Sequence, residues 1–260
     1  MKSSPDPAVR ARFERYLHRV TERLRADDRV IGLVGMGSTA ERWRVDEWSD
    51  HDLAIVVSPG HEESLRFGRD WLPDAEHLVV DVVEWHGGAK LVFDDGRVVE
   101  LGVATPESLR AWAVHHHDVL FDRGGVADAV ADAVASSTAV RDGDLARELQ
   151  LVVATVRIGA GKARRGEVLA GGEMLRHDAV GHLLAAVAIV SPVDARADLL
   201  DPRRRVELTH PELAADLATA IRLPEVELAQ RLLELLEHHF GSYEQFPRRG
   251  VVAIREWLTR

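Results

Sequence analysis

The chain has 260 residues, with 43 acidic and 33 basic side chains and a formal net charge of −10. An apolar content of 46% without a low-complexity tract excludes a disordered protein, and no apolar run is long enough to span a membrane. The absence of cysteine excludes disulfides, thiolate metal sites and cysteine nucleophiles. We expect a cytoplasmic protein, and the lack of a basic excess argues against a nucleic-acid partner.

Residues 1–140 alternate between helical and strand periodicity. The spacing of apolar residues predicts an amphipathic helix over 8–25 and a second helix over 61–71, before Pro73. Asp95-Gly96 predicts a tight hairpin turn, because glycine supplies the positive φ that such a turn requires. Short β-rich runs predict strands at Val30–Met36, Leu53–Val57, Leu78–Trp85, Lys90–Phe93 and Val98–Val103.

Residues 141–260 show helical periodicity only. Helices are predicted at Leu145–Gly159, Val168–Val190, Pro211–Ile221 and Glu225–Phe240. The sequence therefore predicts an α+β protein of two domains. A mixed sheet with helices occupies 1–140, and an all-α bundle occupies 141–260.

A glycine-rich turn ends the first predicted strand. The segment Gly35-Met36-Gly37-Ser38 lets the backbone approach a ligand closely, and a short polar helix is expected to start at Ser38. Exposed amides at such a helix start can bind phosphate. Taken alone, this turn is more often a simple structural feature than a binding site.

Two carboxylates flank His51 where the next strand begins. Asp50 and Asp52 are two residues apart, and residues i and i+2 of a strand point to the same face. Carboxylates so placed repel each other unless a cation lies between them, and Mg²⁺ prefers such oxygen ligands. Asp-x-Asp alone is usually a turn and a cap, whereas its combination with the glycine turn and the apolar strand is specific.

This combination resembles the nucleotidyltransferase superfamily that includes DNA polymerase beta. More narrowly, it resembles the antibiotic nucleotidyltransferases that act on aminoglycosides and lincosamides. The stretch DEWSDHDLAIVV (46–57) is similar to the corresponding segment of streptomycin adenylyltransferases, and FDDGRVVELGV (93–103) looks like the strand pair that carries the family's third carboxylate. In the second half, residues 162–175 and 203–220 resemble the family's helical domain.

The resemblance implies a nucleotidyltransferase-fold domain followed by a helical acceptor-binding domain. It implies two Mg²⁺ ions held by Asp50, Asp52 and Glu100, although many family members have aspartate in place of Glu100. The ions bridge the phosphates of ATP or another nucleoside triphosphate, and a hydroxyl of a small molecule, plausibly an aminoglycoside-type antibiotic, takes up the nucleoside monophosphate as pyrophosphate leaves. Glu100 would be a metal ligand, a general base or both. The alternative is that Glu100 is a solvent-facing strand residue without a function.

Donor phosphates are expected at Gly37 and Ser38, with Arg42 one helical turn further on. For the acceptor, the resemblance points to Glu167 and Asp178 in the helical half. A surface position is the alternative for Arg42 and Glu167, and Asp178 does not align cleanly with the family's acid. We place the acceptor between the two halves, because small-molecule sites favour domain interfaces.

Several alternatives remain open. The histidines at 115–117 and 238–239 suggest metal binding, but consecutive residues of a helix diverge, so solvated or partly packed helix faces are expected instead. Transfer to a protein or a tRNA end, as in toxin-type relatives, is a second enzymatic hypothesis. A non-catalytic nucleotide- or drug-binding relative is a third. The sequence distinguishes neither monomer from homodimer nor ATP from GTP.

Overall fold

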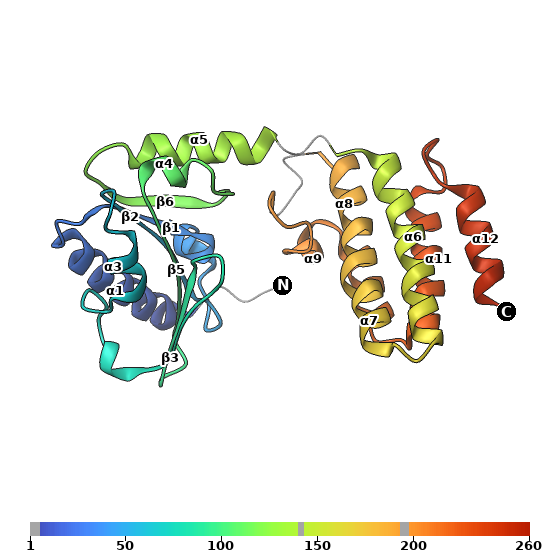
Figure 1. Cartoon of the computed structure of the whole chain (residues 1–260), viewed down its shortest axis with the longest axis horizontal. Helices are drawn as coiled ribbons and strands as arrows, with labels where there is room; N and C mark the ends of the chain where they lie inside the picture. Colours follow the sequence, from blue (N-terminus) through green and yellow to red (C-terminus); the bar gives the residue numbers. More distant parts are fainter. Residues whose placement is uncertain (1–5, 140–142, 193–197) are drawn as a thin grey trace. The chain divides into compact units, whose positions relative to one another are not determined.

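The computed structural model describes residues 6–139, 143–192 and 198–260. The chain forms two compact units, Met1–Thr138 and Ala139–Arg260 (Figure 1). The first unit combines a mixed sheet with helices, and the second contains helices in all its described secondary structure, so the predicted α+β architecture is confirmed.

A six-stranded sheet organises the first unit, with strand order β3-β4-β5-β2-β1-β6. β2 and β5 pair in parallel, and the pairs β1–β2, β1–β6, β3–β4 and β4–β5 are antiparallel. The Asp95-Gly96 turn joins β4 to β5 as expected, with Gly96 at φ 84°. The strands are β1 Val30–Met36, β2 His51–Val57, β3 Leu78–Val83, β4 Ala89–Phe93, β5 Val98–Ala104 and β6 His117–Asp122.

Helices cover both faces of this sheet. On one face, α1 packs Val20 and Leu24 against odd-numbered strand residues such as Leu53. On the other face, α5 packs Val130 against even-numbered residues such as Ala54. The helical segments are α1 Pro7–Arg25, α2 Gly37–Ala40, η1 Arg42–Arg44, α3 Glu62–Phe67, η2 Ala75–His77, α4 Pro106–Leu109 and α5 Val126–Ala139.

Strand alternation assigns the candidate site to one of these faces. In β2, His51 and Leu53 belong to the α1 side, so Asp52 belongs with Ala54 to the α5 side. Asp52 is partly exposed and lines a pocket. The Asp52 side of the sheet therefore remains accessible at this end.

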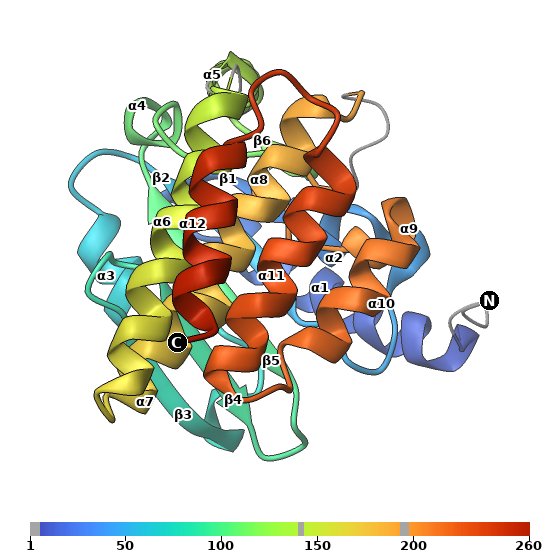
Figure 2. The same ribbon diagram turned by 90° about the vertical axis from the view of Figure 1, so that its right-hand side faces the viewer.

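The second unit is a helical bundle around an apolar core. In Figure 2, α6, α8, α11 and α12 run side by side, and α6 packs against the other three. Leu149, Leu183 and Leu232 are fully buried in the core. Its elements are α6 Leu145–Arg164, α7 Val168–Glu173, the π-helical segment η3 Met174–Ala179, α8 Val180–Val190, α9 Val206–Thr209, α10 Pro211–Ala220, α11 Glu225–Phe240 and α12 Arg248–Leu258. No helix of the described residues is long and apolar enough to cross a membrane.

The structure corrects several predicted elements. The helix expected at 61–71 ends at Phe67, and the helix expected at 168–190 contains the π-helical segment. β6, α5 and α12 were not predicted. His117 begins β6, and His115 and His116 precede it outside any helix, so the expected helical face at 115–117 is wrong. His238 and His239 do lie on a helix, α11.

Candidate functional site

The glycine turn after β1 is tied to the start of β2. The Ser38 hydroxyl donates to the Asp50 carbonyl at 3.1 Å, and the Thr39 hydroxyl accepts from the Asp52 amide at 2.9 Å. Both hydroxyl-bearing side chains are buried. These two bonds fix the turn against the strand that carries the carboxylates. The Ser38 hydroxyl therefore has a structural partner in addition to any phosphate role.

Gly37 adopts φ +53°, a conformation that favours glycine. A Cβ at this position would lie 2.5 Å from Asp52 Oδ2, so glycine also leaves room for that carboxylate. The Gly37 amide donates to the His116 carbonyl at 3.3 Å. The turn is thus shaped around Asp52, although the Gly37 amide itself points to the chain before β6.

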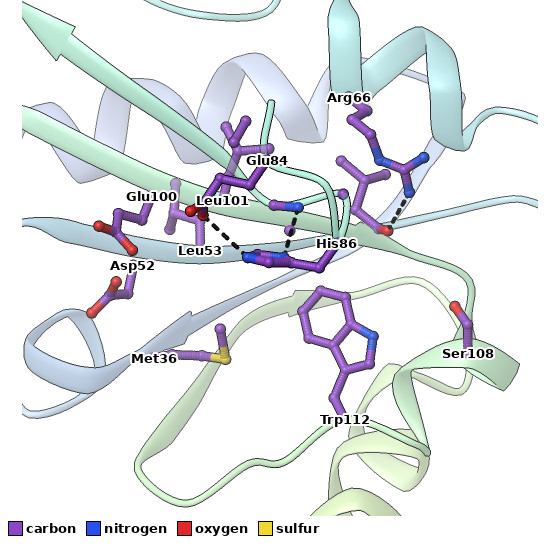
Figure 3. A pocket seen from close by; sticks show the side chains of 15 residues that line it. Met36, Asp52, Leu53, Arg66, Glu84, His86, Glu100, Leu101, Ser108 and Trp112 are labelled. Atoms are coloured by element: carbon purple, nitrogen blue, oxygen red, sulfur yellow. Dashed lines mark hydrogen bonds and ion pairs between the residues drawn. The ribbon is translucent and has the colours of Figure 1, made fainter. Parts of the chain in front are cut away.

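Two carboxylates meet on adjacent parallel strands. Asp52 of β2 is in register with Glu100 of β5, so both side chains point to the same face. Figure 3 shows the two carboxylates next to each other at one end of a pocket. We call Asp52 and Glu100 the carboxylate pair. Residues remote in sequence therefore become neighbours here.

Lys90 of β4 adds a cation beside the carboxylate pair. It lies opposite Glu100 in the antiparallel register of β4 and β5, and its Nζ is 3.3 Å from Glu100 Oε1. The same ammonium is 3.8 Å from Glu84 Oε2. The hydrogen bond to Glu100 is the main cause that raises the pKa of Lys90, so this side chain stays charged across the neutral range.

Asp50 lies at the edge of this arrangement. It precedes β2, is half-buried, and does not line the pocket. Its negative charge is close enough to contribute to the raised pKa of Lys90. The structure therefore brings Asp52 and Glu100 together, with Asp50 nearby rather than in the pair.

The pocket beside the carboxylate pair has a volume of about 490 Å³. Its other end is less acidic. Trp112 lies so close over β5 that a Cβ on Gly102 would approach its ring to 2.2 Å, and Arg66 donates to the Val103 carbonyl at 3.3 Å. Ser108 also lies toward this end (Figure 3). The pocket thus joins a charged end to an aromatic end.

The segment before β4 lines the pocket between these ends, with Glu84, His86, Gly87 and Gly88. His86 Nε2 is 3.2 Å from Glu84 Oε2, and the Gly88 amide donates to His86 Nδ1 at 3.3 Å (Figure 3). Because Glu84 Oε2 also neighbours Lys90, interactions continue from Glu100 through Lys90 and Glu84 to His86. None of Lys90, Glu84 and His86 belongs to a motif that marks it as a site residue in the sequence.

His51, between the two predicted metal aspartates, points to the other side of the sheet. It is 2% exposed and stacks on Phe13 with ring centroids 3.7 Å apart. Burial lowers the pKa of His51 to about 4, which keeps the ring neutral near pH 7. His51 therefore anchors β2 to α1.

The two arginines after the glycine turn have different surroundings. Arg42 forms an ion pair with Asp118 of β6 and donates through Nε to the Thr39 carbonyl at 3.2 Å. Arg44 pairs through Nε with Glu41 Oε2 at 2.7 Å, and its Nη2 lies 3.8 Å from the point that a Cβ on Gly37 would occupy, the same point that Asp52 Oδ2 approaches. Arg44 is thus a cation beside the turn that the sequence analysis missed.

The two candidate acceptor residues lie in the second unit. Glu167 is exposed and precedes α7, with Lys162 Nζ at 3.1 Å and Arg165 Nε at 2.9 Å from its two oxygens. Its hydrogen bonds to Lys162 and Arg165 lower the pKa of Glu167. An acceptor amine would have to compete with both cations. Asp178 is half-buried in the π-helical segment, a type of distortion that is frequent at functional sites.

No protein-family model matches the chain, and no curated protein matches its sequence. Among solved structures, an aminoglycoside 6-adenyltransferase from Bacillus subtilis aligns with 93% of this chain and 95% of its own. The sequence identity is 13% and the TM-score is 0.36.

Proposed function

We propose that the protein is a Mg²⁺-dependent nucleotidyltransferase that transfers AMP from ATP to a hydroxyl of a small molecule. The observation that carries this proposal is the carboxylate pair, because Asp52 and Glu100 share a face and line the same pocket beside the Gly37 turn. An aminoglycoside-type antibiotic is the proposed acceptor, on the strength of the sequence resemblance at 35–57 and 93–103. The first unit carries the nucleotidyltransferase fold in this proposal.

The donor set of the pocket suits a hard divalent cation. Asp52 and Glu100 offer carboxylate oxygens, which Mg²⁺ prefers, and both side chains border an open pocket. Asp50 is a further candidate ligand at its edge. Bound Mg²⁺ would supply positive charge that neutralises a triphosphate and stabilises the charge of the leaving pyrophosphate.

The chain's own residues would position the donor. The Gly37 turn gives close access to the backbone, and Arg44, whose Nε is held by Glu41, would offer Nη2 on the Gly37 side for a charge-assisted hydrogen bond to phosphate. Ser38 keeps the turn in place through Asp50, so we propose that it orients the phosphate site as well as contacting it. Arg42 would need to leave Asp118 in order to contribute.

In the proposed reaction, the acceptor oxygen bonds to the α-phosphorus and the bond between that phosphorus and the bridging oxygen to the β-phosphate breaks. Glu100 would take the proton of the attacking hydroxyl, which requires a carboxylate oxygen within hydrogen-bond reach of it. Trp112 would provide a flat apolar surface for a ring of the bound substrates. We assign acceptor recognition to residues 141–260, with Asp178 and Glu167 as candidate contacts.

Incubation with Mg²⁺, each of the four nucleoside triphosphates, and a panel of aminoglycosides and lincosamides tests the proposal. We expect pyrophosphate release and an acceptor whose mass has grown by one nucleoside monophosphate. Asp52→Asn serves as the inactive control. Tight Mg²⁺-triphosphate binding without any transfer would instead favour a non-catalytic nucleotide-binding protein.

A further inference from the structure

Lysine is rare in this chain, and one of its few copies lies at the carboxylate pair. Of the 33 basic residues, only Lys2, Lys90 and Lys162 are lysines, and the rest are arginines. Lysine and arginine side chains behave differently beside a carboxylate. Arginine forms a rigid fork that holds both oxygens, whereas lysine is a compact charge on a flexible stem. A lysine at position 90 therefore holds Glu100 without enclosing it.

The contacts of Lys90 give its ammonium two alternative partners. Nζ lies 3.3 Å from Glu100 Oε1 and 3.8 Å from Glu84 Oε2, and its side chain is 44% exposed. Glu84 lies just after β3 and lines the same pocket. A small rotation of the lysine stem would exchange one carboxylate for the other.

From this arrangement we infer that Lys90 is an internal counter-ion, which a divalent cation displaces from Glu100 toward Glu84. This inference rests on the proposed metal site and adds a regulatory element to it. In the metal-free protein, the ammonium offsets the repulsion between Glu100 and Asp52 and keeps the pair ordered. When a divalent cation binds, the ammonium moves to Glu84 and the charge around the site stays balanced.

A competing ammonium has a direct consequence for metal affinity. A unit charge within about 5 Å of a divalent cation repels it enough to change affinity roughly tenfold, even at the dielectric constant of water. Lys90 therefore makes the metal site weak on its own. A triphosphate adds negative charge and restores the affinity, so metal and donor bind together.

Mn²⁺ binding to the full-length protein without nucleotide tests the inference, with free Mn²⁺ measured by electron paramagnetic resonance. We expect Lys90→Met to bind Mn²⁺ roughly tenfold more tightly than wild type. Lys90→Gln should also bind Mn²⁺ more tightly than wild type. It serves as a second variant in case Lys90→Met does not fold. Lys90→Arg keeps the charge but clamps both Glu100 oxygens, so it should bind Mn²⁺ roughly fivefold more weakly.

A double-mutant cycle tests the role of Glu84. Glu84→Gln should weaken Mn²⁺ binding in the presence of Lys90, because the displaced ammonium loses its second partner. In the Lys90→Met background, Glu84→Gln should have a much smaller effect on Mn²⁺ binding. Equal effects in the two backgrounds would contradict the role of Glu84. Lys162→Met is the matched control, since it makes the same change in net charge at an ammonium paired with Glu167.

The outcomes separate the inference from the proposed function. If Asp52→Asn abolishes Mn²⁺ binding while Lys90→Met binds no more tightly than wild type, the metal site stands and the counter-ion role of Lys90 is wrong. If wild type and Asp52→Asn bind Mn²⁺ equally, the carboxylate pair is not the metal site, and the proposed function fails with the inference.

Discussion

Glu100 lies directly beside Asp52 across the parallel pairing of β5 and β2. The two carboxylates share one face, and Lys90 of β4 lies next to Glu100 on the neighbouring strand. Two like charges on adjacent strands destabilise a sheet unless a cation offsets them. Lys90 offsets them in part, and a divalent cation bound by the carboxylate pair would offset them further.

Asp52→Asn is expected to remove most of the gain in triphosphate affinity that Mg²⁺ provides. The amide keeps the size of the side chain and the backbone bond to Thr39, but it loses the charge that a hard cation needs. A loss of roughly 100-fold corresponds to about 2.7 kcal/mol. Isothermal titration calorimetry with ATP, in the presence and absence of Mg²⁺, measures the difference.

Asp128→Asn is the control for this change. Asp128 is exposed in the first turn of α5, and its substitution alters the net charge equally. It should retain the full Mg²⁺ effect. An unchanged Mg²⁺ effect in Asp52→Asn as well would rule out Asp52 as a ligand.

Glu100→Gln should separate binding from chemistry. If Glu100 takes the proton of the acceptor hydroxyl, the variant still binds Mg²⁺-ATP through Asp52 but turns over roughly 10²- to 10⁴-fold more slowly. Single-turnover measurements alongside ATP titrations distinguish these effects. A large loss of Mg²⁺-dependent ATP affinity would instead identify Glu100 chiefly as a metal ligand. Unchanged turnover would show that Glu100 is a solvent-facing strand residue without a role in the reaction.

Local patterns predicted the parts of this site that lie close together in sequence. The Asp95-Gly96 turn fixed the pairing of β4 with β5, and the apolar run after Asp52 marked β2. Extending strand alternation to His51 correctly separates it from Asp52, since neighbouring residues point to opposite faces. Counting back from a two-residue turn would have placed Leu91 opposite Glu100. The loop instead has three residues, closed by the Phe93 amide donating to the Arg97 carbonyl, and the register brings Lys90 there.

Long-range pairing explains what the sequence did not reveal. β6 carries only a three-residue apolar run, at 119–121, whose side chains are half-buried, and its pairing with β1 identifies it as a strand. The ion pair of Arg42 depends on that strand, because it supplies Asp118. Likewise, the two cations at Glu167 come from the end of α6 and the turn after it, whose geometry the helical periodicity did not specify.

Stability should fall in acid because of His51. Its pKa is about 4 in the folded protein and about 6.5 when unfolded, so between these values the unfolded state binds the additional proton. Above about pH 6.5, His51 is neutral in both states and does not lower the free energy of unfolding. The free energy of unfolding falls by up to about 1.4 kcal/mol per pH unit as the pH decreases toward 4, a total of about 3 kcal/mol.

Urea unfolding curves between pH 4 and 7.5 measure this slope. His51→Phe preserves the stacked ring on Phe13 and cannot be protonated, so its pH slope should be shallower than that of wild type. His51→Gln provides a second non-titrating side chain. Parallel slopes in wild type and both variants would show that His51 is not the group that titrates.

Gly37→Ala tests the geometric link between the glycine turn and Asp52. Gly37 has φ +53° and Gly60 has φ +91°, so alanine at either position adopts a strained backbone conformation that costs about 1–2 kcal/mol. The two sites differ in their surroundings. A Cβ at 37 lies 2.5 Å from Asp52 Oδ2, whereas a Cβ at 60 meets no atom within 4 Å.

The atom that Gly37→Ala would displace is the end of a flexible side chain, so the protein can relieve the clash by rotating Asp52. We therefore expect Gly37→Ala and Gly60→Ala to lower the free energy of unfolding by similar amounts, about 1–2 kcal/mol each. Only Gly37→Ala should lose Mg²⁺-dependent ATP binding, since its Asp52 carboxylate can no longer occupy its position beside Glu100. Urea denaturation and calorimetry on both variants give the two quantities. If Gly37→Ala is destabilised but binds Mg²⁺-ATP like Gly60→Ala, the position of Asp52 over the turn does not matter for the donor.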